Sequence, residues 1–95
     1  MSGFKPLDPI LHSQLRLAII SLLMGVKTAE FNFIKEKTQA TSGNLSAQLD
    51  KLSTAGYITI EKSFKGKKPV TTCAITKSGL AAFEAYVKAL KEYIE

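Results

Sequence analysis

The spacing of apolar residues changes twice along this chain, and no other feature restricts the fold as much. From residue 10 to residue 55, apolar side chains recur every three or four positions, which is typical of amphipathic helices. Over residues 57–75 they alternate with polar ones, as in half-buried strands, and over 77–94 the helical spacing returns. We therefore expect the order helix, helix, helix, hairpin, helix, a mainly α protein with a small β-hairpin (α+β).

Two helices are predicted in the first 38 residues, each with its own start signal. The first begins at residues 8–9, where Asp precedes Pro, with Ser13 as a second candidate cap, and it ends at Gly25. The second covers about 30–38, with Thr28 as its cap. Both are short, so their stability depends on packing against the rest of the chain.

A third helix follows a turn of about four residues. Thr41 or Ser42 can cap it, and Gly56 stops it. Its leucines are spaced to face a core: Leu45, Leu49 and Leu52. A helix, a turn of this length and a second helix form a helix-turn-helix, which we place at about 30–55.

The segment 57–75 is predicted as a hairpin, or wing. Its strands are 57–62 and 70–75, and a loop over 64–69 contains Gly and Pro. Thr76 caps a last helix at about 77–94. The apolar stripe of that helix is expected to be Leu80, Phe83, Val87, Leu90 and Ile94.

A hairpin directly after a helix-turn-helix is the winged helix-turn-helix arrangement. A short strand near residues 27–28 would join the hairpin, giving the order α-(β)-α-α-β-β-α. With 95 residues the chain fits one domain. We expect a tail at 1–7 and a single winged-helix domain at 8–95.

Positive charge is concentrated in the wing. The formal net charge is +5, and residues 60–76, with four Lys and one Glu, carry +3 of it. Such a cluster favours a polyanion as partner. The single cysteine excludes an internal disulfide, the longest apolar run is far too short to cross a membrane, and no signal peptide is visible. We expect a cytoplasmic protein with no cofactor, no metal site and no catalytic residues.

The third helix offers a polar face opposite its leucines, suited to the major groove of DNA. The expected base-reading residues are those with hydrogen-bonding or methyl groups on that face: Ser42, Asn44, Ser46, Ala47 and Gln48. The expected phosphate contacts are the cap hydroxyl and the nearby lysines: Thr41, Lys51, Lys65, Lys67 and Lys68. Cys73 is expected in the core, and Arg16 is expected to have a structural role rather than to contact phosphate.

Three stretches of the chain resemble the MarR/ArsR-type bacterial winged-helix regulators. The stretch 41–58 (TSGNLSAQLDKLSTAGYI) is similar to their recognition helix, 74–79 (AITKSG) to their strand-to-helix junction, and 7–20 to their opening helix. The match is nearest to stand-alone winged-helix DNA-binding proteins that read GNLSxHLxKL in the third helix. Gln48 stands where these proteins usually have His.

The resemblance implies a homodimeric transcriptional regulator that binds double-stranded DNA. In such proteins the first and last helices usually form the dimer interface, and the first helix here has more apolar surface than one buried face needs. The residues that we assign to this interface are Leu17, Ile20, Met24, Tyr86, Leu90 and Tyr93. A small-molecule effector between the dimer helices is a further option, of unknown identity.

Besides a switch that responds to such an effector, one other function class stays open at this point. A winged helix can serve as a protein-protein interaction module without strong DNA binding, although a lysine-rich wing argues against an interface core there. An enzyme is not expected, because no catalytic triad, carboxylate pair or phosphate-binding Gly loop can be assembled from the sequence.

Overall fold

The computed structural model describes residues 3–94 as four helices and three strands. The elements are α1 (Gln14–Met24), β1 (Ala29–Glu30), α2 (Phe31–Thr38), α3 (Ser42–Thr54), β2 (Ile58–Lys65), β3 (Lys68–Ile75) and α4 (Lys77–Ile94). The predicted order and the α+β winged-helix class are confirmed. Residues 1–2 of the expected tail and residue 95 of the expected domain lie outside the described residues.

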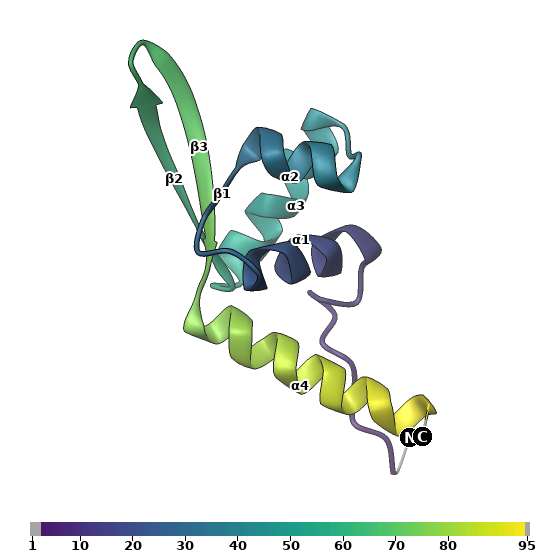
Figure 1. Cartoon of the computed structure of the whole chain (residues 1–95). Coiled ribbons are helices and arrows are strands. Elements are labelled where there is room, and N and C mark those ends of the chain that lie inside the picture. The colour runs from purple at the N-terminus through teal and green to yellow at the C-terminus, as the bar shows by residue number, and fades with distance from the viewer. Residues whose placement is uncertain (1–2, 95) are drawn as a thin grey trace.

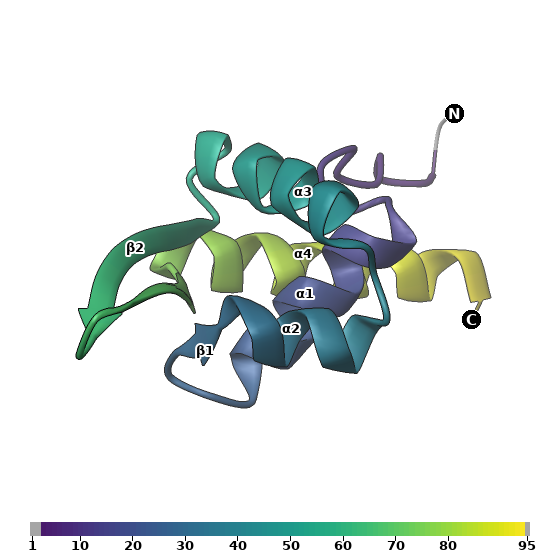
Figure 2. The ribbon, with the colours of Figure 1, turned by 90° about the horizontal axis from the view of Figure 1, so that it is seen from above.

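The helices α1, α2 and α3 form a cluster with the sheet on one side (Figure 1). Figure 2 shows α1 between α2 and α3. The sheet is antiparallel with the strand order β1-β3-β2. The β2–β3 hairpin extends beyond the helices, and α4 extends from the base of β3 on the other side, so the molecule measures 55 × 25 × 21 Å.

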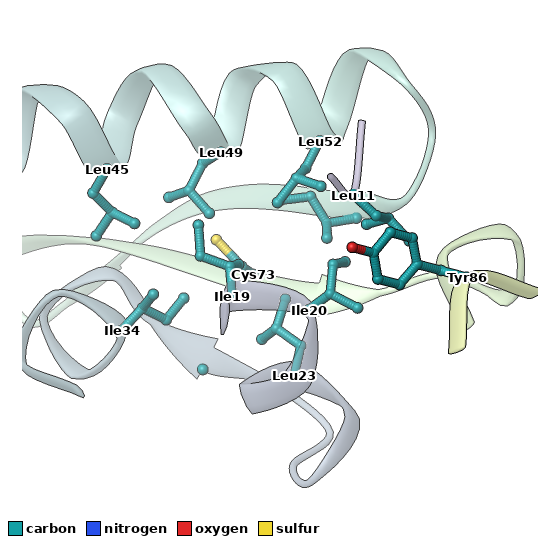
Figure 3. Close-up of a cluster of buried hydrophobic side chains, with 12 residues drawn as sticks. Leu11, Ile19, Ile20, Leu23, Ile34, Leu45, Leu49, Leu52, Cys73 and Tyr86 are labelled. Atoms are coloured by element: carbon teal, nitrogen blue, oxygen red, sulfur yellow. The ribbon is translucent and has the colours of Figure 1, made fainter. Parts of the chain in front are cut away.

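The core lies where α1, α3 and β3 meet (Figure 3). As predicted, the three leucines of the α3 stripe are buried, and so is Cys73. Burial of α3 on this face alone leaves its polar face in solvent. The largest side chains with no exposure at all are Leu11, Ile19, Ile20, Leu23, Ile34, Leu45, Leu52 and Cys73.

The starts of α1 and α2 follow the prediction to different degrees. Helix α1 begins after Ser13, the second of its two candidate caps, whose hydroxyl accepts the backbone N–H of Arg16 at 3.4 Å, and not at Asp8. The Asp8 carboxylate instead accepts the backbone N–H of Ile10 at 2.8 Å and the hydroxyl of Tyr57, and it forms a turn before the helix. Helix α2 is not capped by Thr28, because the chain first enters β1.

The two ends of α3 follow the prediction. The Thr41 side chain caps the helix by accepting the backbone N–H of Asn44 at 3.2 Å. Gly56 has φ +82°, a left-handed conformation that favours glycine. Its N–H bonds to the carbonyl of Ser53, and the N–H of Tyr57 bonds to the carbonyl of Leu52, which is the paired pattern of a Schellman stop.

The wing is longer and its loop shorter than predicted. Lys65 pairs with Lys68 in the sheet, so the turn contains only Gly66 and Lys67. Gly66 has φ +63°, which permits a two-residue turn of the hairpin type. Pro69 pairs with Phe64, at a position where its nitrogen faces away from β2. Because β1 reaches only residues 72–73 of β3, that side is an open edge, where proline is tolerated.

Helix α4 presents a different face to the core from the one predicted. Thr76 caps it as expected, since its hydroxyl accepts the backbone N–H of Gly79 at 3.0 Å. The buried residues are Gly79, Tyr86 and Ala89, whereas two members of the expected stripe, Leu80 and Ile94, are exposed. A Cβ on Gly79 would lie 2.1 Å from the carbonyl oxygen of Tyr57, so the helix can approach Tyr57, the residue just before β2, only with glycine there. This close approach determines which face of α4 is buried.

Candidate nucleic-acid interface

The exposed face of α3 carries the predicted base-reading residues. At 3.6 residues per turn, Ala47 lies opposite the leucine stripe. Asn44 and Ser46 lie on the two flanks, and both are exposed. Ser42, in the first turn, is exposed as well, and Gln48 is half-buried. Four of the five residues are therefore accessible to a ligand along this helix.

Gln48 is held by two side chains. Its amide nitrogen donates to the side-chain oxygen of Asn44 at 3.0 Å, and its oxygen accepts a hydrogen bond from the Arg16 guanidinium. One amide hydrogen of Gln48 remains available for a base edge. The arrangement makes Gln48 a residue that orients the side chain of Asn44.

Arg16 connects this flank of α3 to the N-terminal segment. Its Nε donates to the carbonyl of Ile10 at 2.6 Å, and a terminal nitrogen lies 3.5 Å from the carbonyl of Pro9. The guanidinium is thus used inside the chain, as expected for a structural role. Its charge still lies beside the polar flank of α3, where it favours an anionic ligand.

The predicted phosphate contacts fall in three places. Thr41 is exposed at the N-terminus of α3, where backbone N–H groups favour an anion. Lys51 is exposed in the last turn of the same helix. The remaining three, Lys65, Lys67 and Lys68, lie at the tip of the wing.

Strand alternation divides the wing into two faces. Ile58 on β2 and Cys73 on β3 are buried, and side chains alternate between the two faces of a strand. The even-numbered residues of β2 and the odd-numbered residues of β3 therefore lie on the face that turns toward the helices. Lys65 and Lys68 have the opposite parity and lie on the other face. There the Lys65 ammonium pairs with the Glu30 carboxylate at 2.7 Å. Lys65 is therefore exposed but already engaged.

Two residues on the inner face of the wing were not among the predicted contacts. Lys62 and Phe64 continue the parity of Ile58 and Ile60 beyond the end of the core. A groove of about 340 Å³ between α3 and the sheet includes Ser46, Asp50 and Lys62 among its lining residues. The alternation Ile58, Ile60, Lys62, Phe64 in the sequence could have indicated that these four side chains share one face. The prediction missed it because it began the loop at residue 64.

The residues assigned to a dimer interface do not share one surface. Ile20 is 0% and Tyr86 6% exposed, so both are core residues of the single chain. Tyr86 also shares a hydrogen bond of 3.1 Å with His12. Leu17 and Leu90 are half-buried, and Met24 and Tyr93 are exposed.

Tyr93 has partners within its own chain. Its ring lies 4.9 Å from that of Phe4, and its hydroxyl donates to the carbonyl of Lys5 at 3.1 Å. The backbone N–H of Lys5 in turn donates to Glu92 at 3.2 Å. The N-terminal segment therefore runs along the end of α4, as Figure 1 shows.

Other chemistries find little support in the described part of the chain. Residues 3–94 contain no group of three or more His, Cys, Asp or Glu side chains placed to hold a metal ion. Burial raises the pKa of the Cys73 thiol, which disfavours the reactive thiolate. None of the described helices has the length and apolar character needed to cross a membrane.

Comparison with known proteins adds independent information. Residues 15–94 match the winged helix DNA-binding domain family. An uncharacterised protein of Methanocaldococcus jannaschii is 38% identical over 78 residues, which cover 82% of this chain and 85% of that protein.

Two solved structures are similar in fold. A transcriptional regulator homologue from Pyrococcus horikoshii OT3 has a TM-score of 0.83 and 28% identity, covering 90% of this chain and 84% of that one. A mutant MarR of E. coli complexed with operator DNA has a TM-score of 0.73 and 16% identity, covering 86% of this chain and 58% of that one. The second likeness shows the fold alone.

Proposed function

This chain belongs to the winged helix DNA-binding domain family, and on that premise we propose that it is a sequence-specific transcriptional regulator that binds double-stranded DNA as a homodimer. The observation that carries the proposal is the polar, exposed face of α3 beside a wing rich in lysine. The MarR neighbour was solved with operator DNA, which supports DNA as the ligand class.

In this proposal α3 enters the major groove, which is about 12 Å wide and admits one helix. Asn44 reads a base, with Gln48 holding its side chain in place through the hydrogen bond between them. Ser42, Ser46 and Ala47 supply further contacts to base edges and to a thymine methyl group.

Contacts to the DNA phosphates give affinity and orientation in this arrangement. Thr41 and the α3 N-terminus meet one phosphate, and Lys51 meets another. Lys67 at the turn of the wing contacts phosphate or the minor-groove edge, and Lys68 lies next to it. Lys65 must first leave Glu30 before it can do the same.

The proposed dimer uses the first and last helices. The face of α4 that the core leaves uncovered includes two apolar side chains among charged ones: Leu80 is 40% and Ile94 76% exposed, and Glu84 and Lys91 lie between them. Beside it, Met24 and Phe83 help to line a groove of about 260 Å³ with little polar surface. A twofold dimer that reads two half-sites needs its α3 helices about 34 Å apart, one turn of DNA.

Binding to random duplex tests the proposal first. Fluorescence anisotropy at several salt concentrations, with light scattering on the same sample, should give twice the 10.4 kDa chain mass and steeply salt-dependent binding. A dimer that neutralises about 6–8 phosphates has a log–log slope near −6. A monomer without duplex binding at low salt would instead favour a protein-protein interaction module.

Sequence selection from the same duplex pool tests the reading assignment. On a selected site, Asn44→Ala should cost about 1–3 kcal/mol and relax the preference at one base pair. Asn32→Ala, an exposed asparagine on α2, is the matched control and should change neither. Equal losses on selected and random DNA would contradict base reading by Asn44.

We also propose that the protein acts in the cytoplasm and without catalysis. A small-molecule effector would have to bind between the dimer helices, and thermal stabilisation by candidate compounds would detect it.

A further inference from the structure

The wing exposes an aromatic side chain close to its tip. Phe64 is 71% exposed and lies in β2, two residues before Gly66, which begins the turn. Single exposed apolar side chains are common, so it is the place of this ring, near the tip of a projecting hairpin rich in lysine, that points to a contact with another molecule.

The other exposed phenylalanines have partners within the chain. Phe4 lies against the ring of Tyr93 at 4.9 Å, and Phe33 faces the ammonium of Lys37 at 5.7 Å from its centroid. Among residues 3–94, no comparable ring or cation contact involves Phe64. Its ring is therefore available without loss of an aromatic or cation contact of this kind.

The surroundings of Phe64 identify the chemistry of its partner. Across the hairpin it pairs with Pro69, which makes the inner face of the tip apolar. Lysines lie within four residues on both sides, namely Lys62, Lys65, Lys67 and Lys68. Of these, Lys62 shares the face of Phe64, Lys67 lies in the turn, and Lys65 and Lys68 lie on the other face. A ring with lysines beside it on a narrow tip fits a ligand that is apolar in its interior and anionic at its edges, which describes stacked base pairs between two phosphate strands.

Phe64 lies on the face of the wing that turns toward α3. Phe64 shares its strand face with Lys62, and Lys62 helps to line the groove between α3 and the sheet. Figure 1 shows that the hairpin continues well past the helices on this side. A duplex lying along α3 would therefore pass under the inner face of the wing.

We propose that Phe64 is an apolar wedge that enters the minor groove beside the segment bound by α3 and partly unstacks one base step. This inference rests on the proposed DNA-binding function. Inserted phenylalanines kink duplexes, and pyrimidine–purine steps unstack most readily. The wing would thus favour a flexible TA or CA step at a position that α3 does not contact, and would bend the DNA there.

The test uses a selected duplex with 2-aminopurine placed in turn at each step flanking the α3 site, and a second duplex with a fluorophore pair at its ends. Wild-type protein should raise the 2-aminopurine fluorescence at one step several-fold and shorten the end-to-end distance. Phe64→Ala should abolish both signals and weaken binding about 5- to 20-fold, while the preference read by Asn44 is kept. Phe64→Trp should retain the bend.

Phe33→Ala, which removes an exposed ring from α2, is the matched control and should leave both signals unchanged. If wild type and Phe64→Ala bind with equal affinity and an equal 2-aminopurine response, the wedge is wrong while DNA binding stands. If wild type binds no duplex, both proposals fail. If Phe64→Ala loses affinity for anionic phosphatidylserine vesicles but none for DNA, the wedge is overturned in favour of a membrane contact.

Discussion

The Arg16 guanidinium donates a hydrogen bond to the side-chain oxygen of Gln48, and this contact joins α1 to the exposed face of α3 across 32 positions of sequence. The amide nitrogen of Gln48 in turn donates a hydrogen bond to the side-chain oxygen of Asn44, so Arg16 also restricts the position of Asn44. Since Arg16 also bonds to the carbonyl of Ile10, one guanidinium fixes the N-terminal segment and the proposed reading helix together.

A double-mutant cycle between Arg16 and Gln48 should show coupling. Arg16→Ala and Gln48→Ala each lose the shared hydrogen bond, so the double variant should be more stable than the sum of the two losses by about 1 kcal/mol. Urea unfolding of the four proteins measures this. Gln14→Ala, an exposed glutamine in the first turn of α1, is the control partner and should show no coupling to Gln48.

Two glycines should respond in opposite ways to replacement by alanine. At Gly79 a Cβ would lie 2.1 Å from the Tyr57 carbonyl oxygen, so Gly79→Ala should cost about 3 kcal/mol. At Gly43 nothing lies within 4 Å, and Gly43→Ala should stabilise α3 by up to about 1 kcal/mol. Thermal unfolding compares them. A Gly79→Ala variant as stable as wild type would show that α4 does not approach the Tyr57 carbonyl closely.

The Tyr57–Asp8 hydrogen bond should make stability depend on alkaline pH. This bond, with burial and the nearby negative charge, raises the pKa of Tyr57 from 10 to about 12. The folded state thus favours the neutral phenol. Its contribution is complete below pH 10 and is lost as the pH rises through 12.

Tyr57→Phe should therefore lower the unfolding free energy at pH 7 by about 1–2 kcal/mol and reduce its decline above pH 10. Urea midpoints between pH 7 and pH 12 measure this. Tyr93→Phe, which removes an exposed hydroxyl bonded to a carbonyl, controls for the loss of a phenol. Parallel pH curves for wild type and Tyr57→Phe would contradict the assignment.

Local signals explain what could be predicted from the sequence. The leucine spacing of α3, the Thr41 cap and the stop at Gly56 act within one or two turns of chain, so they are readable without tertiary information. The cap at Thr76 is of the same kind.

The predictions fail where contacts between residues far apart in the sequence determine the structure. Lys65 and Pro69 have low strand propensity and were predicted in the loop of the wing, yet the register imposed by the turn at Gly66 places both in its strands. On α4 an apolar stripe alone cannot show that Gly79 and Ala89 form the buried face, since that depends on how closely the Tyr57 carbonyl approaches the helix. The contact of Arg16 with Gln48 has no local signature at all.

The ion pair between Lys65 and Glu30 should restrain DNA binding. Both side chains are well exposed, at 71% and 45%, so the pair adds little to stability. It nevertheless competes with phosphate for Lys65. Glu30→Gln should therefore leave the unfolding midpoint within about 0.5 kcal/mol of wild type while raising affinity for random duplex about 2- to 5-fold at low salt.

The salt dependence separates release of Lys65 from a simple change in net charge. With Lys65 free to reach a phosphate, the log–log salt slope of Glu30→Gln should steepen by about one unit. Glu36→Gln removes the same charge from α2, and the described residues give Glu36 no lysine partner, so its slope should stay at the wild-type value. Anisotropy titrations of the two variants decide between these explanations. Identical slopes for both would mean that Lys65 does not reach the DNA even when it is released.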